Sequence, residues 1–286
     1  MNIGVSGANG FVGSALVDHL RGQHELTLFV RRERAAATTG ARAILCDLAT
    51  QLPTRQALSA LDVFVHCAHG PTLGPALAKD LFERYQQANP SGLFIFVSSI
   101  NTQVPALSWD LYTRFKTMSE GLLKGVSAHI PAVILRPAFI VSSQHPGSLS
   151  PFLRVARLFR VLPVPNRGPR HLFVALADLA EQVVPLSEAY RAQAGVHEVD
   201  LVGSALHPLG LILAKAARES GFRGPCLPLP RALCSPISAA LPPVTVALCK
   251  VKKLCMDLDI LPRHGEHTLV CRPSRPVLGL NFSWRL

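Results

Sequence analysis

The stretch Asn-Ile-Gly-Val-Ser-Gly-Ala-Asn-Gly-Phe-Val-Gly at residues 2–13 decides the fold. A short apolar strand leads directly into Gly7, Gly10 and Gly13, and an amphipathic run at Ser14–Leu20 follows. In such a strand–turn–helix unit the glycines allow a tight turn, a close approach of backbone N–H groups to a pyrophosphate, and close packing of helix on strand. The start of the helix then faces the phosphates with its partial positive charge. The stretch therefore predicts a dinucleotide site.

The composition is that of a globular α/β protein with a preference for anionic ligands. The 286 residues are 49% hydrophobic, enough to bury the core of one large domain with a small appended lobe. The net charge of +11 suits dinucleotides and nucleotide sugars. The basic residues are scattered, and only three Tyr and two Trp accompany them, so we expect no nucleic-acid partner.

Cysteine usage and the first residues indicate a cytoplasmic protein without a metal. The seven cysteines form no CxxC or Cys/His pattern, and their odd number is typical of reduced thiols. The start of the chain has neither a charged n-region nor a cleavage site and reads as a core strand.

One apolar stretch, Ala232–Leu248, has the hydrophobicity of a membrane segment. Its prolines at 236, 242 and 243 favour a buried helix pair over a spanning helix. Three lysines follow, so interfacial membrane contact through residues 232–256 stays open as an alternative.

Apolar runs alternate with helix-like segments, as in a parallel sheet covered on both faces. The expected strands are Asn2–Ser6, Leu26–Val30, Ala43–Cys46, Val63–His66, Leu93–Ser98 and Ala132–Arg136. The expected helices are Gly13–Arg21, a short turn at Gln56–Leu61, Pro75–Ala88, Leu111–Lys124, Phe152–Phe159, Leu179–Ser187 and Leu206–Ser220. We predict an α/β fold with a Rossmann-type doubly wound parallel sheet formed by residues 1–140 and 169–202. A smaller C-terminal substrate lobe would comprise residues 141–168 and 203–286, with an irregular, Pro-rich end.

Three residues are candidates for catalysis. Tyr112 and Lys116 stand four apart, so a helix places them on one face, and the ammonium would lower the pKa of the phenol. Such a tyrosine exchanges a proton with a substrate oxygen while hydride moves to or from a nicotinamide. Ser99 ends a buried strand, where ligands bind in open α/β sheets, and would hydrogen-bond the same oxygen. The alternatives are a surface Tyr–Lys pair and a serine that caps the next turn.

Six motifs occur in order over roughly residues 1–190. They are Gly7-x-x-Gly10-x-x-Gly13, Asp47-Leu48, Asp62-Val-Phe-Val-His66-Cys-Ala68, Val97-Ser-Ser99, Tyr112-x-x-x-Lys116-x-x-x-Glu120 and Leu135-Arg-Pro137. Together they resemble the extended short-chain dehydrogenases/reductases, in the NAD-dependent epimerase/dehydratase family.

The resemblance implies a role for each matching residue. Catalysis would fall to Ser99, Tyr112 and Lys116, whereas Glu120 would be structural. The implied cofactor contacts are Gly7, Asn9, Gly10, Phe11, Val12 and Gly13 at the pyrophosphate, Asp47 and Leu48 beside the adenine, Ala68 in the cleft, Lys116 at the ribose and Pro137 near the nicotinamide.

The cofactor preference has a separate signal in Arg31 and Arg32, which follow the second strand where an NAD-binding fold often has an acidic residue. Arginines there favour the 2′-phosphate of NADP. The alternative is that Arg31 stacks on adenine, which NAD also allows.

The substrate is indicated by the segment Phe159–Glu181, which resembles that of bacterial nucleotide-sugar epimerases and 4-ketoreductases of surface-polysaccharide synthesis. By this analogy Arg167 or Arg170 would contact the nucleotide diphosphate and, with Ser99 and Tyr112, form the substrate site. The alternative is an exposed basic turn. The resemblance also allows a homodimer through the helix that carries Tyr112.

The sequence departs from the family pattern near the substrate. Ser99 and Tyr112 are only 13 residues apart, and no Val-Tyr-Gly follows the serine. Shorter loops favour a reductase over an epimerase, which must let a ketone intermediate rotate. An NADPH-dependent reductase of a small ketone, aldehyde or lipid-like alcohol, or a non-catalytic dinucleotide-binding protein, stays open as an alternative.

Overall fold

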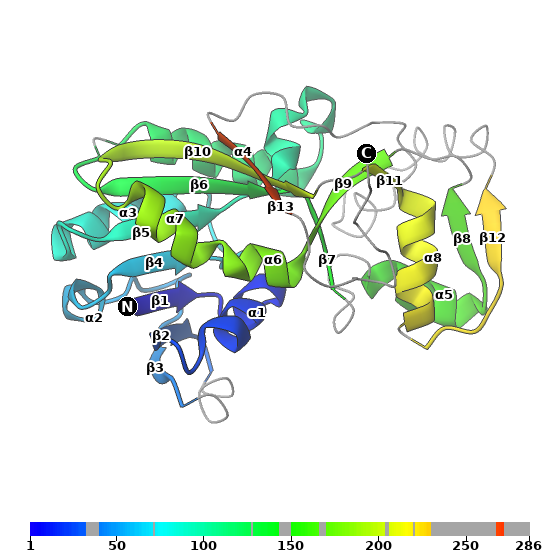
Figure 1. Cartoon of the computed structure of the whole chain (residues 1–286), viewed down its shortest axis with the longest axis horizontal. Coiled ribbons are helices and arrows are strands. Elements are labelled where there is room, and N and C mark those ends of the chain that lie inside the picture. Colours follow the sequence, from blue (N-terminus) through cyan, green and yellow to red (C-terminus); the bar gives the residue numbers. More distant parts are fainter. Residues whose placement is uncertain are drawn as a thin grey trace.

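The computed structural model describes residues 1–32, 40–70, 72–126, 128–142, 150–165, 170–203, 206–219, 221–229 and 267–271. Its centre is a sheet of eight strands in the order β13-β10-β6-β5-β4-β1-β2-β3, and every neighbouring pair is parallel (Figure 1). These strands are β1 (Asn2–Ser6), β2 (Glu25–Val30), β3 (Arg42–Leu45), β4 (Val63–His66), β5 (Leu93–Val97), β6 (Pro131–Pro137), β10 (Gly195–Gly203) and β13 (His267–Cys271).

The inner strands are apolar on both faces because helices cover both. Every residue of β4, β5 and β6 is buried, which is typical of a parallel sheet between two helical layers. One face packs against α1 (Phe11–Leu20), α6 (Leu176–Glu181) and α7 (Val183–Tyr190). The other packs against α2 (Arg55–Ser59), α3 (Leu77–Ala88) and α4 (Leu111–Lys124). The predicted doubly wound Rossmann-type sheet is therefore confirmed.

The strand order reverses between β1 and β4. The chain moves outward from β1 through β2 to β3, then crosses back to β4 on the other side of β1. The ends of β1 and β4 meet at the register pair Ser6–His66. Open α/β sheets bind ligands at this kind of switch point, outside the carboxyl ends of the strands.

A smaller lobe lies beside the sheet, on the right in Figure 1. It contains α5 (Ser150–Phe159), β8 (Leu162–Pro165), α8 (Leu209–Glu219) and β12 (Cys226–Leu229). Leu153, Leu162, Ala217 and Phe222 belong to a hydrophobic cluster of its own. A three-stranded sheet of β11 (Leu206–Pro208), β9 (Arg170–Ala175) and β7 (Phe139–Val141) lies between this lobe and the main sheet. A second, smaller lobe is therefore present, whereas residues 230–266 and 272–286 of the predicted lobe, with the apolar stretch Ala232–Leu248, lie outside the described residues.

Three features of the second half differ from the sequence-based expectation. The helix expected at Leu179–Ser187 is two helices, α6 and α7, because Pro185 lacks the N–H that a continuous helix would need there. The helix expected from Leu206 starts only at Leu209, after strand β11. β10 was not expected, and β13, which pairs with it, falls in the range 203–286 that the predicted division assigns to the lobe.

Candidate active site

A cavity of about 780 Å³ opens at the carboxyl ends of the central strands. Its wall is formed by the glycine loop after β1, the end of β2, the loops after β3 and β4, the end of β5 and one face of α4. Most residues expected at a dinucleotide therefore surround a single space, although they come from distant parts of the sequence.

The glycine loop is shaped by close backbone contacts. Gly7 has φ +75, and a Cβ built on it would lie 2.7 Å from the backbone nitrogen of Ala68. A Cβ on Gly13 would lie 2.2 Å from the carbonyl oxygen of Gly7. Side chains at these two positions would push the loop away from β4 and from its own helix. Glycine is therefore required by geometry at both.

The N-terminus of α1 faces the cavity. Gly10 is its N-cap residue and offers no side-chain hydrogen bond to the first turn. Phe11, Val12 and Gly13 of that first turn line the cavity, together with Asn9. Backbone N–H groups and the helix dipole together make such an end favourable for an anion. This geometry fits the pyrophosphate of a dinucleotide.

A neutral histidine supports this loop from inside the sheet. His66 Nδ1 and Ser6 Oγ are hydrogen-bonded at 2.7 Å. His66 is buried between the rings of Phe94 and Phe96. Burial, and to a smaller extent the charge of Lys116, lowers the pKa of His66 to about 3.

The predicted adenosine end of the cavity carries two arginines. Arg31 and Arg32 are exposed and line the cavity directly after β2. Asp47 and Leu48, after β3, line the same region. The Asp47 carboxylate accepts a hydrogen bond from the backbone of Ala49 at 3.1 Å, which keeps it in its own turn.

α4 brings Tyr112 and Lys116 to the cavity. Its N-cap Asp110 is buried and accepts hydrogen bonds from the backbone N–H and hydroxyl of Thr113, at 2.8 and 2.6 Å. This cap fixes the start of the helix two residues before Tyr112 and six before Lys116. Lys116 Nζ donates to the carbonyl of Val97 at 2.7 Å and lies 4.6 Å from the centre of the Phe96 ring. Burial lowers the pKa of Lys116 to about 8, against the charges of Cys67 and Glu120.

The phenol of Tyr112 differs from the expectation. Its pKa is raised to about 12 rather than lowered, because burial and the charge of Asp110 outweigh the hydrogen bond with Ser99. Lys116 Nζ is 6.0 Å from the centre of the Tyr112 ring and is held by Val97, so its charge does not offset burial. Tyr112 is therefore a neutral phenol at pH 7 in this structure.

The other predicted site residues lie in different places. Ser99 is half-buried and hydrogen-bonded with Tyr112, although it is not part of the cavity wall. Pro137 is buried at the end of β6 and also lies outside the wall. Arg170 is exposed on β9, opposite Pro208, and does not line the cavity. Arg167 lies outside the described residues.

His69 lines the cavity, but sequence reasoning missed it. Its ring meets those of Tyr112 and Phe115 edge to face, with centroids 4.9 and 4.8 Å apart. Burial and Lys116 lower the pKa of His69 to about 4, so the imidazole is neutral. The available signal was its position in the loop that directly follows β4, three residues after His66, where open α/β sheets bind ligands. The thiol of neighbouring Cys67 has a pKa raised to about 12 by burial, which makes it a poor nucleophile.

Comparison with known families identifies the chain. The sequence profile of a family described as NAD(P)H-binding matches residues 7–149, half of the chain. The chain belongs to this NAD(P)H-binding family. The matched range contains the glycine loop, both arginines after β2, and α4. A comparison with curated proteins gave no match.

Solved structures share the fold of this NAD(P)H-binding protein at low sequence identity. UDP-glucuronic acid 4-epimerase from Bacillus cereus, in complex with NAD, aligns with TM-score 0.61 and 19% identity over 80% of this chain and 87% of its own. UDP-glucose 4-epimerase from Thermus thermophilus, also in complex with NAD, aligns with TM-score 0.58 and 16% identity over 80% of this chain and 86% of its own. MoeE5 in complex with UDP-glucuronic acid and NAD aligns with TM-score 0.60 and 19% identity over 80% of this chain and 86% of its own. The fold is thus that of nucleotide-sugar epimerases.

The part of the chain that the structure describes holds no cluster of three or more His, Cys, Asp or Glu side chains that could bind a metal ion. No helix in it is both long and apolar enough to cross a membrane.

Proposed function

We propose that this protein is an NADP-dependent oxidoreductase or epimerase that moves hydride between the nicotinamide and a hydroxyl- or carbonyl-bearing carbon of a nucleotide sugar. One observation carries the proposal. A single cavity has a phosphate-binding glycine loop, an arginine pair after β2, and the Tyr112–Lys116 face of α4 in its wall. A dinucleotide with a substrate beside it needs these three regions in one space.

The chain's own residues would divide the work as follows. The backbone N–H groups at the start of α1 and the arginines after β2 bind the anionic parts of the dinucleotide. When bound, the nicotinamide supplies or accepts the hydride. Tyr112 donates its phenolic proton to the substrate oxygen or takes it back, and Ser99 orients that oxygen by a hydrogen bond. Lys116 adds a positive charge that stabilises the phenolate once it forms.

Tyr112 carries the proton that reduction of a carbonyl requires. A phenol with a pKa of about 12 is protonated at pH 7 and can act as an acid towards a carbonyl oxygen. Proton donation leaves a phenolate, which burial opposes, so the reaction needs a positive charge near this phenolate.

Arg31 and Arg32 support the choice of NADP. Both are exposed on the cavity wall, where a 2′-phosphate could be reached by a guanidinium. We expect the dissociation constant of NADPH to be about tenfold or more below that of NADH, and the double variant R31A/R32A to remove the difference. Fluorescence titration measures both. Tighter binding of NADH to the wild type would refute the NADP assignment.

The substrate class is tested by ligand-induced stabilisation. UDP- and TDP-sugars should raise the melting temperature of the NADPH-loaded protein, because a ligand that binds only the folded state stabilises it. A second candidate is an NADPH-dependent reductase of a small apolar ketone or aldehyde. Leu73 and Ile140 line the cavity, whereas Arg170 does not, and this favours an apolar substrate. Stabilisation by ketones and not by nucleotide sugars would select it.

We also propose that two copies pair through α4 and that the protein is cytoplasmic. Leu111, Met118 and Leu122 are 45, 53 and 39% exposed and lie on one face of α4. Met118→Lys should convert a dimer into a monomer in size-exclusion chromatography, and an unchanged elution volume would refute the interface. Cys46, Cys67 and Cys226 are free thiols, which suits a reducing compartment.

A further inference from the structure

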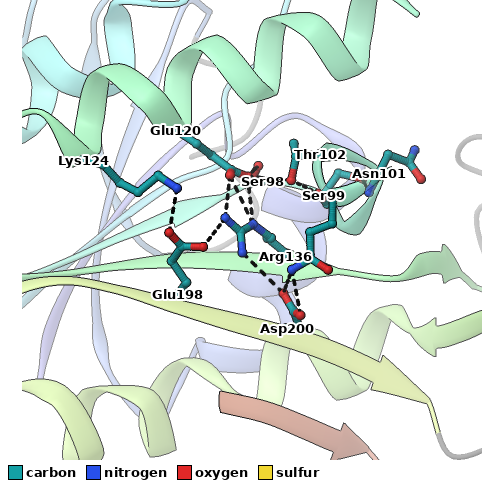
Figure 2. Close-up of polar contacts among 10 residues, drawn as sticks. Ser98, Ser99, Asn101, Thr102, Glu120, Lys124, Arg136, Glu198 and Asp200 are labelled. Atoms are coloured by element: carbon teal, nitrogen blue, oxygen red, sulfur yellow. Dashed lines mark hydrogen bonds and ion pairs between the residues drawn. The ribbon is translucent and has the colours of Figure 1, made fainter. Parts of the chain in front are cut away.

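A buried carboxylate lies behind the candidate catalytic residues. Glu120 is on α4, one helical turn beyond Lys116, and is only 4% exposed. Its Oε1 accepts hydrogen bonds from Ser98 Oγ and, at 3.0 Å, from Thr102 Oγ1 (Figure 2). These two residues stand on either side of Ser99 in the chain. One carboxylate oxygen thus holds both flanks of the turn that carries the serine.

The same turn fixes the serine itself. The backbone N–H of Thr102 donates to the Ser99 carbonyl at 3.1 Å, and the Thr102 hydroxyl lies 2.9 Å from that carbonyl. The single hydroxyl hydrogen of Thr102 is therefore shared between Ser99 and Glu120. Asn101 donates its N–H to Ser99 Oγ at 3.3 Å. The Ser99 hydroxyl accepts this bond and directs its own hydrogen towards Tyr112, its other partner.

Arg136 keeps Glu120 in place from β6. Its Nη2 and Nε donate to Glu120 Oε2 at 2.7 and 3.1 Å. Two acids of β10 face the same guanidinium: Glu198 contacts Nη2, and Asp200 lies 3.7 Å from Nη1. Although burial lowers the pKa of Arg136, hydrogen bonds and charges of Glu120 and Glu198 raise it overall. The guanidinium thus stays charged in the interior.

A second tether joins the turn to β10. Gln103 ends the short 3-10 helix that follows Ser99, and its amide nitrogen donates to both oxygens of Asp200 at 2.8 Å. Asp200 is fully buried. The Ser99 turn is therefore held from α4 through Glu120 and from β10 through Gln103. Figure 2 shows the two carboxylates, Glu120 and Asp200, on either side of Arg136.

We propose that Glu120 is a positioning residue that sets the Ser99 hydroxyl against Tyr112 by holding Ser98 and Thr102. The proposal deepens the proposed function, since it rests on Tyr112 acting as the acid or base there. A buried ion pair is weak evidence for stability, because apolar residues of similar volume are often at least as stabilising. Directional hydrogen bonds to both neighbours of one serine instead fix a geometry, which an apolar contact would not.

A double-mutant cycle tests the proposal, with the titration of Tyr112 as its readout. The three tyrosines, at 85, 112 and 190, are replaced by a fluorinated tyrosine with a more acidic phenol, and the Tyr112 signal in the ¹⁹F NMR spectrum is assigned with Y112F. Thr102→Val removes one hydroxyl without changing any charge, and Thr102→Ser is the matched control. Ser99→Ala reports the full effect of losing the serine.

We expect T102V to raise the Tyr112 midpoint by about half a pH unit, a change of the size that losing part of one hydrogen bond to the phenolate produces. T102S should keep the wild-type midpoint. In an E120Q background, T102V should shift the midpoint much less, because both changes act on the same contact. E120Q also removes a negative charge, but this changes the Tyr112 midpoint equally with and without T102V, so the charge effect cancels in the comparison.

Two outcomes would overturn the proposal. Equal shifts by T102V in both backgrounds would mean that Thr102 acts on Ser99 without Glu120. No shift with T102V, although S99A shifts the midpoint, would mean that the turn does not depend on this contact. If E120Q does not fold, Ser98→Ala replaces it, since it removes a Glu120 contact and leaves the Arg136 pair intact; an unchanged midpoint would then overturn the proposal.

The titration needs no substrate, so its failure is distinguishable from failure of the proposed function. Should no nucleotide sugar or ketone react with NADPH, the proposed activity fails while the Tyr112 midpoint still reports on Glu120. With an active substrate, T102V should lower kcat about threefold, the change to which half a pH unit corresponds, and leave the dissociation constant of NADPH unchanged. T102S should restore kcat.

Discussion

His66 is expected to make the folded protein sensitive to mild acid. It is buried beside Ser6, and its pKa of about 3 lies far below the ordinary value of 6.5. A group whose pKa is lowered on folding stabilises the protein fully above its unfolded pKa. That stability is lost as the pH falls, because the unfolded chain binds a proton that the folded chain refuses. The affected window therefore runs from pH 6.5 down to about pH 3.

The size of the effect follows from the two pKa values. A pH of 5 lies about 1.5 units below the pKa of the imidazole in the unfolded chain, which is therefore protonated, whereas the imidazole in the folded protein is still neutral. At about 1.4 kcal/mol per unit, the free energy of unfolding falls by about 2 kcal/mol between pH 7 and pH 5. This is a substantial part of the 5–15 kcal/mol that holds a typical domain folded.

Urea unfolding followed by circular dichroism at pH 7 and pH 5 measures this loss. H66Q keeps a polar group for the Ser6 hydroxyl but cannot titrate. Wild type should therefore lose about 2 kcal/mol more than H66Q over this interval. H129Q carries the same substitution at an exposed position and should behave like wild type. Parallel pH dependence of wild type and H66Q would refute the argument that His66 is held neutral by burial.

Three further substitutions test the glycine loop, the core and the charge cluster. Gly13→Ala places a Cβ 2.2 Å from the Gly7 carbonyl oxygen and should weaken NADPH binding at least about tenfold in a fluorescence titration, whereas Gly121→Ala, with open space around it, should not. Tyr85→Phe removes one of the two donors to the Leu61 carbonyl, the other being Asn89 Nδ2 at 2.6 Å, and should lower the free energy of unfolding in urea by about 0.5–1.5 kcal/mol; no change would contradict that bond. Arg136→Met leaves Glu120 and Asp200 without a cation, whereas Glu198 keeps its pair with Lys124, and it should cost about 3–5 kcal/mol at pH 7 in the same assay. Part of the loss should be recovered at pH 5, because burial raises the pKa of Asp200 and favours its protonation once the guanidinium is gone.

The elements that sequence predicted best are those whose signals are local. α4 spans Leu111–Lys124 as expected, because its apolar period and its Asp110 cap are both written in adjacent residues. β1 and β4 likewise match their expected bounds, since short apolar runs between turn residues need no distant partner to be recognised. The glycine loop belongs to the same class.

β10 could not be predicted because its sequence contains acidic residues that ordinarily indicate a solvent-exposed segment rather than a strand inside a sheet. It carries Glu198 and the fully buried Asp200. Arg136 of β6, more than 60 residues earlier in the chain, faces both acids, with Lys124 of α4 also beside Glu198 and Gln103 beside Asp200. No local signal reveals that pairing.

In the candidate site, too, local sequence signals were readable whereas the effects of tertiary contacts were not. Its residue types were recognisable from spacing, but the acidity of Tyr112 was not. Spacing places Lys116 one turn away, whereas the tertiary structure decides that its ammonium is bound to Val97 and that burial dominates the phenol. His69 was missed because its role depends on the rings of α4 beside it.

A single-turnover measurement shows whether Tyr112 exchanges a proton with the substrate during hydride transfer. Wild type and Y112F, each loaded with NADPH, are mixed with a UDP-4-ketohexose, and oxidation of the bound NADPH is followed by its fluorescence. We expect oxidation to be at least about a hundredfold slower in Y112F at equal NADPH affinity, the size expected for loss of a general acid. Equal rates in the two proteins would refute this role of Tyr112.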